Sequence, residues 1–101
     1  MSTEYIAKRT LIGKSSKQGR FLIKIRIGKP YRNDFDWACP VAVEGLDTNI
    51  PDVNGADSLQ ALTLAVWTAR NCLEQFMQRG GTLDAPGERP GPVSLEEIFG
   101  Y

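Results

Sequence analysis

The sequence predicts an α+β fold: an antiparallel meander of three to four strands packed on one long α-helix, with a short C-terminal helical turn. Three observations predict it. Apolar and polar residues alternate in the first half of the chain, as in strands with one buried face. A single apolar stripe at helical spacing follows. No helical crossover separates the early strands, which favours antiparallel over parallel pairing.

The first two strands are expected to form a hairpin. Residues 5–12 are rich in residues that favour β-structure, and residues 21–27 alternate strictly, with Lys24 and Arg26 opposite the isoleucines. Residues 13–19 begin and end with glycine, and we expect them to be the loop between the strands.

The third strand is expected over residues 37–44, which alternate again. Pro40 has no N–H group to donate, so this strand must carry a bulge or an edge there. Residues 50–53 are the candidate for a short fourth strand, and Pro51 again suits an edge.

The long helix is predicted from about residue 58 to residue 79. Asp57 and Gln60 have the spacing of a capping box, and Gly80–Gly81 supplies a stop signal. The apolar stripe has its members three or four residues apart, which predicts one buried face. The expected core comprises Phe21, Ile23, Ile25, Ile27, Trp37, Val41, Val43, Leu59, Leu62, Val66, Leu73 and Phe76.

The C-terminal region is predicted to be a linker followed by a docking helix. Residues 82–92 contain three Pro–Gly or Gly–Pro pairs, which indicates a segment without secondary structure. Ser94 and Glu97 then form a second capping box. We therefore divide the chain into an α+β domain at 1–81 and a Pro/Gly-rich linker with a short docking helix at 82–101. A helix this short needs a surface to pack on, and Leu64 and Trp67 offer one. A second copy and a foreign partner are the alternatives.

The composition argues against most enzyme classes. The chain has no histidine, which excludes a Ser-His-Asp triad and a His-ligated metal site. The two cysteines are too few for a structural zinc site, and the aspartates fall where turns and helix starts explain them. We expect no enzymatic activity, cofactor or metal. With no signal peptide or membrane span in the sequence, we expect a cytoplasmic protein with no membrane partner.

The charge distribution points to binding surfaces instead. Residues 1–33 hold nine basic side chains and one acidic side chain, whereas residues 34–101 hold three basic and eleven acidic ones. Two oppositely charged regions suit partners of opposite charge. Large apolar residues outside the helical stripe suit a partner as well. The candidate partner-binding residues are Asp34, Asp36, Leu64, Trp67, Lys24, Arg26, Ile98 and Phe99.

Several segments carry a resemblance to a known family. They include Arg26-Ile-Gly-Lys-Pro30, Asp36-Trp-Ala-Cys-Pro40 and Gly55-Ala-Asp-Ser-Leu-Gln-Ala-Leu62. Through them the chain resembles an uncharacterised family of small bacterial proteins, a domain of unknown function, over about residues 6 to 78. The resemblance implies a small sheet with one long helix. Members look like proteins found near toxin and mobile-element loci, which favours an immunity-type or adaptor role.

The leading hypothesis is a non-enzymatic protein-binding domain, in its specific form an immunity-type protein that binds and blocks a bacterial toxin. The alternatives are a nucleic-acid-associated protein that uses the basic N-terminal hairpin, and a small homodimeric adaptor. A small hydrolase or transferase that uses Asp and Arg groups is a further rival. Nucleic acid is the less favoured partner, because few aromatic residues lie among the lysines.

Overall fold

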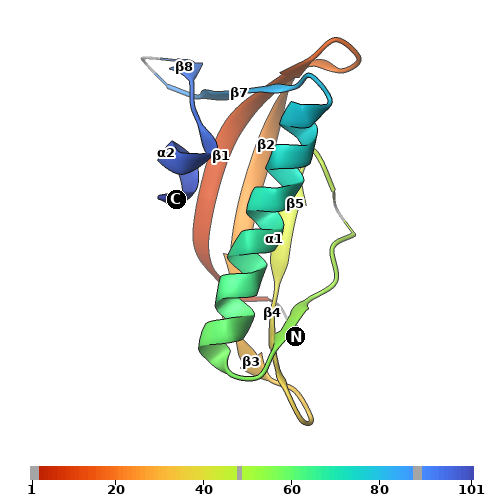
Figure 1. The fold of residues 1–101 in the computed structure, drawn as a ribbon, viewed down its shortest axis with the longest axis vertical. Helices are drawn as coiled ribbons and strands as arrows, with labels where there is room; N and C mark the ends of the chain where they lie inside the picture. Colours follow the sequence, from red (N-terminus) through yellow and green to blue (C-terminus); the bar gives the residue numbers. More distant parts are fainter. Residues whose placement is uncertain (1–2, 48, 88–89) are drawn as a thin grey trace.

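One long helix lies against one face of an antiparallel sheet. The computed structural model describes residues 3–47, 49–87 and 90–101. In it, α1 (Ser58–Gln78) packs on a five-stranded sheet of order β5-β2-β1-β7-β8 (Figure 1). That sheet contains β1 (Tyr5–Ser15), β2 (Gly19–Gly28), β5 (Val41–Glu44), β7 (Thr82–Ala85) and β8 (Gly91–Pro92). A second sheet of order β3-β4-β6 contains β3 (Tyr31–Arg32), β4 (Trp37–Cys39) and β6 (Val53–Gly55). The α+β class is confirmed, with eight strands in the described residues rather than three or four.

The β1–β2 hairpin is longer than the sequence suggested. Residues 13–15 were expected to begin a loop but continue β1, and the turn needs only residues 16–18. Gly13 explains the difference, because a Cβ atom there would lie 2.9 Å from the ring of Phe21, its partner across the ladder. This glycine makes room for an aromatic side chain within the sheet and does not mark a turn.

Pro40 divides the expected third strand between the two sheets. β5 pairs with β2, whereas β4 pairs with β3 and β6. At the junction the carbonyl of Pro40 accepts the Gly28 N–H at 2.7 Å, and the thiol of Cys39 donates to the Gly28 carbonyl at 3.2 Å. The predicted irregularity at Pro40 is confirmed. The short strand expected at 50–53 is β6, which lies at Val53–Gly55.

Both ends of α1 are capped as predicted. The Asp57 carboxylate accepts the Gln60 N–H at 2.7 Å. The Gln60 side chain reaches back to the N–H of Ala56, also at 2.7 Å. At the other end the N–H groups of Gly80 and Gly81 donate to the carbonyls of Met77 and Phe76, which is a Schellman motif.

The buried face of α1 differs from the predicted stripe. Ala61, Ala65, Ala69 and Leu73 are fully buried, and Phe76 is buried with 8% of its surface exposed. Leu59 was assigned to the core but is 72% exposed, and Leu62 and Val66 are half-buried at the flanks. Trp37 and Phe21, also assigned to the core, are half-buried against it. The alanines allow the helix backbone to approach the sheet closely, so the larger side chains are displaced to the sides.

The described part of the expected linker, residues 82–87 and 90–92, contains two short strands and is not unstructured as its Pro and Gly content suggested, while residues 88–89 lie outside the described residues. β7 pairs with β1, and Leu83 is buried opposite Gly13. Asp84 forms an ion pair with Lys14 at 2.8 Å. Pro86–Gly87 therefore only ends β7, and the Gly91–Pro92 pair itself forms β8, the edge strand of this sheet.

The short helix α2 (Leu95–Phe99) packs on its own chain, but not on the expected surface. Its predicted capping box between Ser94 and Glu97 is confirmed. α2 lies beside α1 over β1 (Figure 1), and Arg70 Nε donates to the carbonyl of Tyr101 at 3.2 Å. Trp67 remains 55% exposed. Neither of the two helices that the structure describes is long and apolar enough to cross a membrane.

Enlarging the alanine face should destabilise the fold. We expect Ala65→Leu to lower the free energy of unfolding by about 1–3 kcal/mol, because the extra methylenes must force α1 away from the sheet. Thr63→Leu, which introduces the same side chain on the exposed side of α1, should change it by less than about 0.5 kcal/mol. Urea unfolding followed by circular dichroism measures both values. Equal stability of the two variants would contradict the close approach described here.

Candidate protein-binding surfaces

The outer face of the five-stranded sheet is basic. The ladder register pairs Lys8 with Arg26, Thr10 with Lys24 and Lys14 with Arg20, and directly opposed residues point to the same side. The core residues of β1 and β2 point to the other side, where both α1 and α2 lie (Figure 1). Within the described ranges, no helix covers the outer side. We call this surface the basic face; its cations are Lys8, Lys14, Arg20, Lys24 and Arg26.

Two carboxylates flank the basic face at its edges. Glu44 of β5 pairs with Arg26 at 2.8 Å, and Asp84 of β7 pairs with Lys14. Lys8, Arg20 and Lys24 have no ion pair with any residue that the structure describes. The face is therefore net positive. The two basic residues that the sequence singled out, Lys24 and Arg26, are adjacent on it.

The loop between β3 and β4 carries an almost completely exposed aromatic side chain. We call residues 34–36, Asp34, Phe35 and Asp36, the acidic tip. Asn33 and Asp36 exchange backbone hydrogen bonds at 2.7 and 3.0 Å, and the Asn33 side chain accepts the Asp34 N–H at 3.0 Å. These bonds fix a tight loop, and Phe35 is 95% exposed at its apex. Sequence reasoning named both aspartates and missed Phe35, although a lone aromatic residue in a polar loop was a usable signal.

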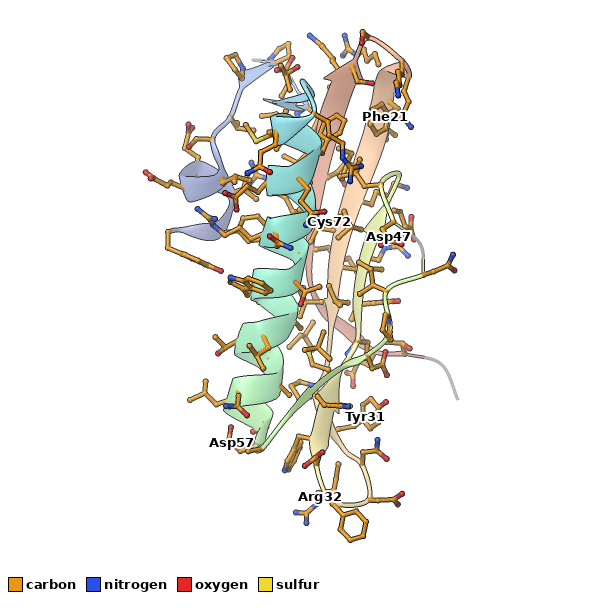
Figure 2. The ribbon with its side chains drawn as sticks, turned by 45° about the vertical axis from the view of Figure 1, so that its right-hand side comes forward. Phe21, Tyr31, Arg32, Asp47, Asp57 and Cys72 are labelled. Atoms are coloured by element: carbon orange, nitrogen blue, oxygen red, sulfur yellow. The ribbon has the colours of Figure 1, made fainter. Side chains whose placement is uncertain are left out.

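Other apolar side chains are exposed at the same end of the molecule. Tyr31 is 43% exposed and Leu59, in the first turn of α1, is 72% exposed. Figure 2 shows Tyr31 and Arg32 at the end that also holds Asp57, the N-cap of α1. The Tyr31 hydroxyl donates a hydrogen bond to Asp52, and this bond raises the tyrosine pKa. This end is therefore both acidic and apolar.

The eight predicted site residues do not converge on one site. Lys24 and Arg26 lie on the basic face, and Asp34 and Asp36 lie on the acidic tip. Leu64 and Trp67 are exposed on α1, at 38% and 55%. Ile98 and Phe99 are half-buried against the core of their own chain. The structure thus places two surfaces of opposite charge in different parts of the molecule.

The two thiols are held in their neutral form. Cys39 is fully buried, and burial raises its pKa. Cys72 is half-buried, and its pKa is raised by burial and then by Asp47, while Arg79 opposes the shift. A nucleophilic cysteine needs the opposite shift. Across residues 3–47, 49–87 and 90–101, no group of three or more Cys, Asp or Glu side chains could hold a metal ion.

Residues 7–92 match a family described as a domain of unknown function, DUF6968. The chain belongs to the DUF6968 family. The match runs from β1 to β8, so it includes the strands that follow the glycines at the end of α1. No curated protein and no solved structure matches the chain. The family description names no activity, so any function must be argued from the surfaces.

The raised pKa of Cys72 predicts a shifted alkylation profile. Only the thiolate reacts with iodoacetamide, so in the folded protein the rate at Cys72 should rise at higher pH than in urea. The sign follows from burial, which disfavours the charged thiolate. Mass spectrometry of tryptic peptides measures the rate at each thiol, with buried Cys39 as the unreactive control. A folded profile at lower pH than the unfolded one would mean that Cys72 is activated.

Proposed function

We propose that this chain is a non-enzymatic protein-binding domain whose acidic tip inserts into a partner protein. The observation that carries the proposal is the 95% exposure of Phe35 on a loop fixed by three hydrogen bonds. Burying such a side chain stabilises a structure by about 1.5–3 kcal/mol. The isolated chain does not gain this energy. A complex in which a pocket of the partner buries Phe35 would gain this energy. Because the loop is already held in shape, it loses little conformational entropy on binding.

The chemistry of the tip defines the partner. Phe35 calls for an apolar pocket, and the flanking Asp34 and Asp36 call for lysine or arginine residues around its rim. Leu59 and Tyr31, exposed at the same end, would extend the contact around the central ring. Charges at such a rim mainly accelerate association and make it depend on salt.

The specific form that we propose is an immunity-type protein that blocks a toxin. Its support is the resemblance to small proteins found near toxin and mobile-element loci, together with a tip shaped to plug a pocket. A toxin partner would be encoded nearby, and its growth inhibition would be relieved by this chain. A homodimeric adaptor is the alternative within the same class, and it would use the exposed side chains Leu64 and Trp67.

A second candidate function is the binding of nucleic acid on the basic face. It is favoured by Lys8, Arg20 and Lys24, which have no carboxylate partner among the described residues. From Lys8 to Lys14 the face extends for about 20 Å along β1, the length of several nucleotides. The carboxylates of Glu44 and Asp84 at its two edges would repel phosphates, so we rank it second.

Removing the ring of Phe35 should abolish most of the affinity for the partner. With the tagged chain used to isolate a stoichiometric partner from its native host, Phe35→Ala should weaken binding about thirtyfold or more, as expected for a central aromatic anchor. Asp34→Lys combined with Asp36→Lys should slow association about tenfold at low salt. Calorimetry measures the affinity and stopped-flow fluorescence measures the association rate.

Leu22→Ala is the matched control for this experiment. Leu22 is also a large exposed apolar residue, at 56%, but it lies on the basic face. Its replacement should leave the partner's affinity unchanged. If Phe35→Ala and Leu22→Ala bind the partner as tightly as the unmodified chain, the tip is not the interface. Loss of binding only with Leu22→Ala would transfer the interface to the basic face.

The nucleic-acid alternative predicts salt-dependent binding of DNA. Lys8→Glu combined with Arg20→Glu should abolish the binding of a labelled oligonucleotide, whereas Lys29→Glu combined with Arg32→Glu, the same charge change outside the five-stranded sheet, should weaken it only slightly. Lys24 and Arg26 are left intact, because reversing either charge would place a second carboxylate beside Glu44. Fluorescence anisotropy over a salt series measures the binding. Absence of binding at low salt would eliminate this function.

A further inference from the structure

A cavity of about 530 Å³ lies at the C-terminal end of α1. It is enclosed on one side by the β1–β2 turn with Ser16 and Lys17, and on another by residues 45–47 after β5. The last turns of α1 contribute Cys72, Phe76 and Arg79. This volume is in the range of pockets that hold small organic molecules.

The cavity combines an apolar wall with many hydrogen-bond donors. Leu46 is half-buried and Phe76 is buried, and both line it. The donors are the hydroxyls of Ser15 and Ser16, the amides of Gln18 and Gln75, and the charged groups of Lys17 and Arg79. Asp47 is the one carboxylate in the lining, and one of its oxygens accepts the Asn49 N–H at 3.0 Å. Neither Lys17 nor Arg79 forms an ion pair within the part of the chain that the structure describes.

Glycines maintain the shape of this cavity. Gly45 has a φ of +100°, and a Cβ atom there would lie 2.4 Å from the carbonyl oxygen of Leu22. Gly81 allows the ring of Phe76 to lie directly against the backbone, because a Cβ atom would come within 2.4 Å of that ring. The ring also makes an edge-to-face contact with Phe21, with 5.6 Å between the ring centroids. The apolar wall is therefore fixed before any ligand arrives.

We propose that this cavity binds a small organic anion, a carboxylate or a phosphate monoester, whose apolar body packs on Phe76 and Leu46 and whose anionic group is bound by Lys17 and Arg79. The lining holds two cationic side chains, Lys17 and Arg79, and one carboxylate, Asp47, so its net positive charge favours an anionic ligand. The C-terminal end of α1 by itself disfavours an anion, and the hydrogen bonds that the carbonyls of Met77 and Phe76 accept in the Schellman motif reduce this repulsion, so the attraction must come from Lys17 and Arg79. The site lies outside the acidic tip and the basic face, so it does not depend on the proposed function.

Cys72 provides a direct probe of occupancy. It lines the cavity and is half-buried, whereas the other thiol, Cys39, is fully buried. Both Asp47 and Arg79 act on the pKa of Cys72, which agrees with their lying around one space. Figure 2 shows Cys72 on the side of α1 that faces Asp47. A ligand in the cavity should therefore slow the alkylation of Cys72.

The experiment compares three probes with the same ring: benzoate, phenyl phosphate and neutral benzamide. We expect at least one of the two anions to slow alkylation of Cys72 by iodoacetamide about tenfold at saturation, and benzamide to have no effect. Protection by only one anion identifies the preferred headgroup and supports the site. Equal protection by benzamide, or protection by none of the three, would overturn the proposal.

Variants that change one charge test whether Lys17 and Arg79 bind the anion that protects Cys72 from alkylation. Lys17→Gln and Arg79→Gln should each raise the dissociation constant of the anion about tenfold, as expected for the loss of a charged hydrogen bond. Asp47→Asn should lower it, because the one repelling carboxylate is removed. Lys29→Gln, the same change outside the cavity, should leave it unchanged. Calorimetry measures each constant. Equal binding by the Lys17, Arg79 and Lys29 variants would show that the cations do not hold the ligand.

Discussion

The close contact between α1 and the sheet determines most of this structure. It is made by Ala61, Ala65 and Ala69, which present almost no side chain to the strands. Dispersion energy and hydrophobic burial both depend on such close approach, because a small gap already loses much of the attraction. The same packing displaces Leu62 and Val66 to the flanks, where Val66 contributes to the surface under α2. The alanine face thus positions the C-terminal helix as well as the long one.

The junction of Gly28 and Pro40 has a comparable effect on the other end of the molecule. Pro40 ends the ladder of β5, and its ring lies so close to Gly28 that a Cβ atom there would be 2.7 Å away. The chain on either side of Pro40 therefore joins different sheets. The smaller sheet then carries the β3–β4 loop, and with it the acidic tip, away from the basic face. One proline and one glycine thus separate the two oppositely charged surfaces.

The sequence predicted those elements that depend on local chemistry. The alternation in β2, the caps at Asp57 and Ser94 and the irregularity at Pro40 all follow from neighbouring residues. The sequence-based predictions were wrong where a contact between residues far apart in the chain determines the structure. Leu59 was assigned to the core because it is a large apolar residue, yet the buried residue of this turn is Ala61. β7 was missed because its ladder partners, residues 12–14, lie far away in the sequence. Phe35 gave a sequence signal, since it is the one aromatic residue in a polar loop, but its 95% exposure comes from the structure, because the sequence does not show whether such a ring folds inward.

The way the larger sheet ends has a consequence for solubility at high concentration. A long, regular edge strand offers free backbone groups to a neighbouring molecule and so promotes amyloid-like pairing. Here one edge is β5, four residues that begin directly after a proline, and the other is β8, two residues that include Pro92. β5 also turns back on itself, through an isolated bridge between Val43 and Asp47. β5 and β8 are thus too short and too irregular to template a second sheet. β7 pairs with β1 only at residues 12–14, however, so among the described residues the backbone edge of residues 5–11 is a stretch to which a second copy could add a strand.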